Sequence, residues 1–165
     1  MSRNRFAFIV SIVALVLTTE AVVAQSGSRD ADVLTTVDAA LSAAQSGDLK
    51  KLRDQYAADC IFVDEFAPFH WSGPNAIDNY FASAARMYQE TQHGEVRMTV
   101  RPATYVYISG DNAYLVKPLS EKATVRGKVY KSTGFLTFTL ARIDHVWKIT
   151  SQIWSKTSEN MNPYK

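Results

Sequence analysis

The chain has 165 residues, a length that fits one domain and is sufficient to bury an apolar core. It contains 18 basic and 16 acidic residues, and its formal net charge is +2. No stripe rich in Lys and Arg is present, which argues against a nucleic-acid-binding protein. With a single cysteine, Cys60, the chain has no second thiol for an internal disulfide.

The first 24 residues have the pattern of a secretory signal peptide. Arg3 and Arg5 give a positive start, residues 6–17 form an almost uninterrupted apolar run, and small residues precede Gln25. The pattern predicts cleavage after Ala24 and export to the periplasm or the extracellular space. The apolar run is shorter than the roughly 20 residues of a membrane span, so we expect no stable membrane anchor. An uncleaved anchor is the alternative.

Two helices are predicted between residues 30 and 56. Residues 25–29 are small and polar, which predicts a flexible leader in front of them. Apolar residues then recur at helical spacing as far as Ser46. Gly47 suits the end of that helix, and Asp48 suits the N-cap of a second, shorter one.

A strand and a third helix follow. Residues 60–66 are rich in strand-forming residues, and Pro68 ends the run. Gly73-Pro74 opens the third helix, because proline at the first helical position loses no needed hydrogen bond. We expect this helix to end near His93-Gly94.

The rest of the chain has β character. Four runs of strand-forming residues are separated by turn sequences, and they cover residues 95–108, 113–119, 124–142 and 146–155. Residues 157–165 are polar and are expected to form a loose tail. Helices segregated from antiparallel strands predict an α+β fold, in which three helices pack on a curved antiparallel sheet within one domain, residues 30–156.

Four stretches of the sequence resemble one known superfamily. They read S-G-D-L (46–49), Y-A-A-D-C-I-F-V-D-E (56–65), H-W-S-G-P-N-A-I (70–77) and V-W-K-I-T-S-Q-I-W-S (146–155). In these stretches and in its order of elements the chain resembles the NTF2-like superfamily, which includes SnoaL-like proteins and ketosteroid isomerases. The resemblance implies a cone-shaped α+β fold. It does not fix a function, because one fold supports many activities.

The resemblance carries over one catalytic position. In ketosteroid isomerase-like proteins the general base is an Asp at the end of the first strand, and Asp64 stands in that place. The two groups that form the oxyanion hole of those enzymes fall on Ala40 and near Leu136, which cannot supply it. The resemblance therefore implies a base without the steroid-isomerase oxyanion hole.

Asp64 and His70 are the candidate catalytic residues. Asp64 and Glu65 are adjacent on the predicted strand, so we expect only one of them, Asp64, to face a pocket together with Phe62. Apolar surroundings would raise the pKa of Asp64 toward that of a useful base. His70 could approach it across the turn and complete a proton shuttle. The alternatives are a structural ion pair for Asp64 and a backbone hydrogen bond for His70.

Aromatic side chains supply the candidate ligand-binding surface. The residues expected to bind a ligand are Phe62, Trp71, Tyr80, Tyr105, Tyr130 and Trp154. On the last strand, one of the two alternating faces is a mixed polar and aromatic surface that suits either a pocket floor or a dimer interface. No spacing of His, Cys, Asp and Glu is typical of a metal site, and no cofactor-binding motif is present.

These observations predict an exported protein that binds a small, largely apolar molecule in the cone and forms a homodimer through its sheet. The alternative is an acid–base enzyme of the isomerase, dehydratase or cyclase type that uses Asp64 and His70. We expect neither a metal nor a cofactor.

Overall fold

The computed structural model describes residues 17–164, with side chains from Asp30 onward. Most of the predicted signal peptide, residues 1–16, thus lies outside the described part of the chain. Among the described helices, none is long and apolar enough to cross a membrane.

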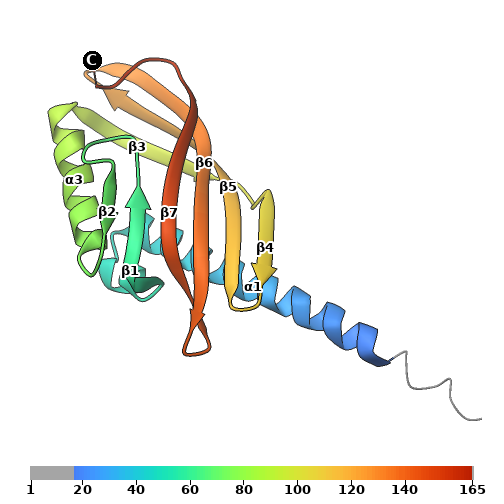
Figure 1. Cartoon of the computed structure of the whole chain (residues 1–165). Helices are drawn as coiled ribbons and strands as arrows, with labels where there is room; N and C mark the ends of the chain where they lie inside the picture. The colour runs from blue at the N-terminus through green and yellow to red at the C-terminus, as the bar shows by residue number, and fades with distance from the viewer. Residues whose placement is uncertain (1–16, 165) are drawn as a thin grey trace, which may run out of the picture.

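Three helices and seven strands make up the described residues. The helices are α1 (Leu17–Ser46), α2 (Leu49–Arg53) and α3 (Ala76–Glu90). The strands are β1 (Tyr56–Val63), β2 (His70–Ser72), β3 (His93–Val100), β4 (Tyr105–Ser109), β5 (Asn112–Val125), β6 (Lys128–Ile143) and β7 (Val146–Glu159). The chain thus has an α+β fold built on one curved sheet (Figure 1).

The strands pair in the order β2-β1-β7-β6-β5-β3. Strand β5 pairs with β6 along one edge and with two strands along the other: residues 112–116 pair with β4, and residues 119–125 pair with β3. All pairs are antiparallel except β1 with β7, which run parallel. Because they pair with different halves of β5, strands β3 and β4 lie toward opposite ends of that strand (Figure 1).

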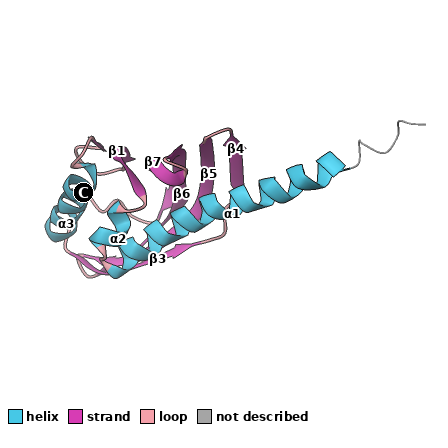
Figure 2. Cartoon of the chain, turned by 90° about the horizontal axis from the view of Figure 1, so that it is seen from below, coloured by secondary structure: helices cyan, strands magenta, loops and turns pink. Residues whose placement is uncertain are grey.

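The helices cover one face of the sheet. Helix α1 runs beneath several strands and extends past β4 toward its N-terminus (Figure 2). Asp48 caps α2 by accepting a hydrogen bond from the backbone N–H of Lys51 at 3.1 Å, as its sequence position predicted. Gly47 precedes it with a φ of 72°, a conformation that glycine adopts without steric cost.

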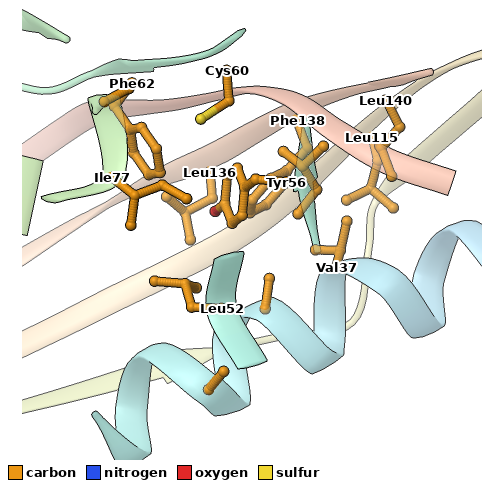
Figure 3. Close-up of a cluster of buried hydrophobic side chains, with 14 of the residues drawn as sticks. Val37, Leu52, Tyr56, Cys60, Phe62, Ile77, Leu115, Leu136, Phe138 and Leu140 are labelled. Carbon is orange, nitrogen blue, oxygen red and sulfur yellow. The ribbon is translucent and has the colours of Figure 1, made fainter. Parts of the chain in front are cut away.

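The core lies between α1, α2 and the concave side of the sheet. Every second residue of β6 is buried over most of its length, so one face of the strand is apolar. In Figure 3, Val37 and Leu52 from the helices face Leu115, Leu136 and Phe138 from the sheet. Each such fully buried side chain stabilises the fold by about 1.5–3 kcal/mol relative to an exposed one.

The ends of the domain differ from the sequence prediction. Helix α1 begins at Leu17, so it includes residues 25–29, which were expected to form a flexible leader. At the other end, β7 continues to Glu159, and the following residues are held by hydrogen bonds that join Asn160 to β6 and Tyr164 to Glu65. The segment expected to be a loose tail is therefore attached to the domain.

Candidate functional site

The molecule has a cavity of about 830 Å³ between α1, α3 and the sheet. Its walls are largely apolar and aromatic, with side chains that include Leu41, Phe62, Phe66, Tyr80, Phe81, Met87, Leu119, Leu136 and Trp154. Polar groups also line it and include Asp64, Glu65, Tyr88, Glu121 and Tyr130. A cavity of this size with apolar walls and a few polar groups is typical of small-molecule sites.

Asp64 presents a half-buried carboxyl group to this cavity. Its Oδ2 accepts a hydrogen bond from the Tyr80 hydroxyl at 2.8 Å, and its Oδ1 accepts one from the backbone N–H of Glu65 at 2.7 Å. Burial raises the pKa of Asp64 to about 6, although these two hydrogen bonds act in the opposite direction. Desolvation therefore dominates, and the prediction of a raised pKa agrees with the structure.

Tyr80 is held in place by a shell of aromatic rings. Its ring stacks on Phe62 with a centroid distance of 4.6 Å, and it contacts the edge of Trp71 at 5.1 Å. Trp71 is itself fixed because its Nε1 donates to the Ser83 hydroxyl at 3.1 Å. The Tyr80 hydroxyl is thus aimed at Asp64 by packing, which orients the carboxyl group.

Glu65 lines the cavity as well, contrary to the expectation that only one of the two acids could. Its Oε2 lies 2.8 Å from the Nζ of Lys156, which also pairs with Glu159. Strand β1 ends at Val63, so the strict alternation of faces no longer applies to the next two residues.

Glu121 adds a third carboxyl group from the opposite wall. It lies on β5, its Oε2 accepts a hydrogen bond from Ser132 at 3.2 Å, and burial raises its pKa. The nearby charges of Glu65 and Asp64 act in the same direction, which indicates that the three carboxyl groups share one space. Sequence alternation could have revealed Glu121, because it shares a face of β5 with Leu115 and Leu119.

Four of the predicted ligand-binding residues line the cavity, namely Phe62, Tyr80, Tyr130 and Trp154. Trp71 does not: its side chain is buried behind Tyr80 and supports the wall from outside. Tyr105 is 53% exposed on β4. It pairs with Val116 rather than with an inward-facing residue, so it lies on the other side of the sheet.

His70 does not join Asp64. It is exposed on β2, where it pairs with Val63 of β1, and it is absent from the residues that line the cavity. The turn between the two strands returns the chain alongside β1 instead of across the pocket. The structure therefore gives Asp64 a tyrosine as its neighbour and leaves no Asp–His pair.

Within residues 17–164, no group of three His, Cys, Asp or Glu side chains could hold a metal ion.

The family is decided by a match to a family model. A model described as a SnoaL-like domain matches residues 33–158. The chain is a SnoaL-like domain protein. The resemblance inferred from the four sequence stretches is thereby confirmed.

Solved structures show the same fold at low identity. The SnoaL-like domain is similar to a hexachlorocyclohexane dehydrochlorinase, LinA-type3, from Novosphingobium barchaimii LL02 (TM-score 0.68, 12% identity, 82% of this chain, 90% of that chain). It is also similar to a putative ketosteroid isomerase from Shewanella frigidimarina (TM-score 0.61, 22% identity, 75% of this chain, 94% of that chain). A search of curated proteins gives no match. The family contains both ligand-binding and isomerase or dehydratase members, so the fold leaves both open.

Proposed function

We propose that this protein is exported and binds a small, largely apolar molecule in the cavity beneath the sheet. The observation that carries the proposal is the cavity itself, about 830 Å³ with aromatic walls. Its polar groups give a bound molecule one defined orientation, because the apolar part fits only against the aromatic walls.

The charges at the polar end limit the class of ligand. Asp64, Glu65 and Glu121 contribute three carboxyl groups to the cavity wall. The nearby cations are already paired, Lys156 with Glu65 and Glu159, and the lining residue Arg97 with Glu95. An added anion would be repelled by these carboxylates. We therefore propose a ligand that is neutral or cationic at this end and apolar elsewhere.

Binding is tested with the neutral fluorescent dye N-phenyl-1-naphthylamine and a matched pair of variants. Ala84 on α3 lines the cavity, whereas its neighbour Ala85 is exposed. Ala84→Trp should fill the cavity and lower dye affinity at least tenfold, and Ala85→Trp should leave it unchanged. Equal affinities for both variants would place the dye, and the proposed site, elsewhere.

The second candidate function is acid–base catalysis with Asp64 as the base. It is favoured by the desolvated carboxyl group, since a base whose pKa lies near the working pH transfers protons efficiently. Tyr80 would orient this base, because its hydroxyl donates a hydrogen bond to the Asp64 carboxyl group. The chemistry would be removal of a proton from a carbon next to a polarising group, as an isomerase, dehydratase or cyclase requires.

Catalysis is tested with 5-nitrobenzisoxazole, a probe whose ring opens when a base removes its C3 proton. The rate should rise with pH with a midpoint near 6 and should be lost in Asp64→Asn, while that variant still binds the dye. A rate that survives this substitution would remove the catalytic candidate and leave the binding protein.

Export is the part of the proposal that rests on the N-terminal sequence alone. Mass spectrometry of the protein secreted by its native host should find a chain that begins near Gln25. Recovery of intact Met1 in a membrane fraction would contradict it.

A further inference from the structure

The last described residues cross the polar end of the cavity. They are attached to the sheet at Asn160 by three hydrogen bonds to β6. The Asn160 backbone N–H donates to the Lys131 carbonyl at 3.1 Å, its Oδ1 accepts from the Lys131 N–H at 2.7 Å, and its Nδ2 donates to the Val129 carbonyl at 2.9 Å. Asn160 therefore fixes the direction in which the chain leaves β7.

Beyond this anchor the chain becomes part of the cavity wall. Pro163 and Tyr164 both line the cavity, and less than 2% of the Pro163 side chain is exposed. The Tyr164 hydroxyl donates to Oε1 of Glu65 at 3.3 Å. Its ring lies 5.9 Å from the ammonium group of Lys156, which is a favourable cation–π distance.

Breaking the contacts of Tyr164 costs little free energy. When Tyr164 leaves, Glu65 keeps its ion pair with Lys156 at 2.8 Å, so no buried charge is left without a partner. The hydrogen bond that is lost is long, and the tyrosine hydroxyl regains water. Opening beyond the Asn160 anchor is opposed by the burial of Pro163 and by the packing of Met161 against the buried cluster of Ala123, Val125 and Tyr130.

We propose that residues 160–164 form a strap that closes the polar end of the cavity and controls which molecules enter and how long they stay. The part that concerns ligands rests on the proposed function. The closure itself does not, because it concerns the access of any small solute to the cavity. Tyr164 would then be a specificity-determining residue, since it narrows the entrance with an aromatic ring beside Glu65.

Closure can be measured without any ligand, through Trp154. This indole lines the cavity, whereas Trp71 and Trp147 are 5% and 4% exposed. Collisional quenching by acrylamide therefore reports access to the cavity, and Trp154→Phe supplies the background. A chain that ends at Met161 should show a Stern–Volmer constant at least twofold higher than the full chain, with no such change in the Trp154→Phe background.

A chain that ends at Tyr164 is the matched control and should behave as the full chain. Circular dichroism checks that each variant is folded. If the shorter chain does not fold, Tyr164→Ala replaces it, and the same increase is expected. Equal quenching in the full-length and opened proteins would overturn the strap, whether or not the dye binds.

The ligand part has its own readout. Stopped-flow release of N-phenyl-1-naphthylamine should be at least fivefold faster in the opened chain than in the full chain. If quenching rises but the release rate of the dye does not change, the strap closes the cavity without controlling how long a ligand stays, and the ligand part of the proposal is wrong. A full chain that binds no dye would contradict the proposed function, and the quenching result would still decide whether the strap closes the cavity.

Discussion

At the scale of single residues, the pKa of Asp64 is determined mainly by the cavity around it. Its carboxyl group loses water on folding, and two hydrogen bonds only partly compensate. A pKa of about 6 in the folded protein lies above the value of about 3.9 in an unfolded chain. The folded state therefore binds a proton more readily than the unfolded state.

This difference predicts how stability changes with pH. Because the folded-state pKa is raised, the contribution of Asp64 is most favourable below about pH 4 and is lost as the pH rises to about 6. The loss amounts to about 3 kcal/mol above pH 7. Asp64→Asn cannot ionise, so the variant should be more stable than the parent at pH 8 and similar at pH 4. Urea unfolding at both pH values checks this, and a destabilised variant at pH 8 would indicate a structural role for the charge.

Tyr80→Phe removes the hydroxyl that donates to Asp64. Because this hydrogen bond lowers the pKa of Asp64, its loss should raise that pKa above 6 and cost about 1–3 kcal/mol of stability at pH 8. NMR titration of the Asp64 carboxyl carbon and a thermal melt measure the two effects. Tyr88→Phe is the control, since Tyr88 lines the same cavity but does not donate to Asp64. An equal pKa shift in both variants would contradict the assignment.

The sequence predicted the position of Asp64 but not its neighbours. Asp64 could be placed because strand periodicity and the superfamily resemblance agree there. Glu65 was placed on the wrong face because the strand ends one residue before Asp64. His70 was placed near Asp64 because the path of a loop cannot be read from spacing, and here the loop forms a further strand.

At the scale of elements, Gly134 determines where β7 directs its side chains. A Cβ at this position would lie 2.2 Å from the Ser155 carbonyl oxygen and 2.7 Å from the Trp154 ring. The register of β6 and β7 shifts beside it, between Thr133 and Gly134. Close approach of the two backbones at this bulge places Trp154 in the cavity wall and Lys156 beside Glu65.

Gly134→Ala should therefore both destabilise the fold and disturb the cavity. The added methyl group must push the Ser155 backbone away, at an expected cost of about 1–3 kcal/mol. Dye affinity should fall as Trp154 moves. Gly94→Ala, in strand β3, is the control, because its Cβ would meet only an ordinary contact with Thr124 at 3.4 Å. Chemical unfolding of both variants compares them, and similar stabilities would contradict the crowding at Gly134.

The β character of this half of the chain was predictable from the sequence, but strand bounds and partners were not. The turn between β5 and β6 lies at residues 126–127, whereas the sequence placed it at residues 120–123. Residues 95–108 were predicted as one bent strand, and the structure divides them into β3 and β4, which pair with different halves of β5. The parallel pairing of β1 with β7 joins Tyr56 to Ile149 and has no local signal. A second register shift, between Thr139 and Leu140, breaks the alternation on β7. Trp147 and Trp154 are seven residues apart and would point to opposite faces of a regular strand, but because of this shift both point inward.

At the scale of the whole molecule, no helix of the part of the chain that the structure describes covers the outer face of the sheet beside β4 and β5. Tyr105, Tyr107 and Tyr114 are 53%, 58% and 41% exposed there, and Phe135 is 39% exposed. Tyr107 pairs directly with Tyr114 across β4 and β5, and the ring centroids of Tyr105 and Tyr114 are 6.0 Å apart, so these three side chains form one aromatic surface. Two copies could bring such aromatic faces together and remove them from water.

We propose that a second copy of this chain covers that face. Multi-angle light scattering of the protein should give the mass of a dimer, and Tyr107→Arg should give a monomer, since the arginine would be buried without a partner. Val129→Arg adds the same charge at the far end of β6 and should leave the dimer intact. A monomeric parent protein would contradict the proposal.

The burial of Asp64 also couples occupancy of the cavity to proton exchange with the solvent. A neutral ligand that displaces water from the carboxyl group would raise its pKa further, so binding near pH 6 should take up a fraction of a proton. A cationic ligand would stabilise the carboxylate and release a fraction of a proton instead. Calorimetry in two buffers with different ionisation enthalpies measures this number. Its sign would identify the charge of the natural ligand.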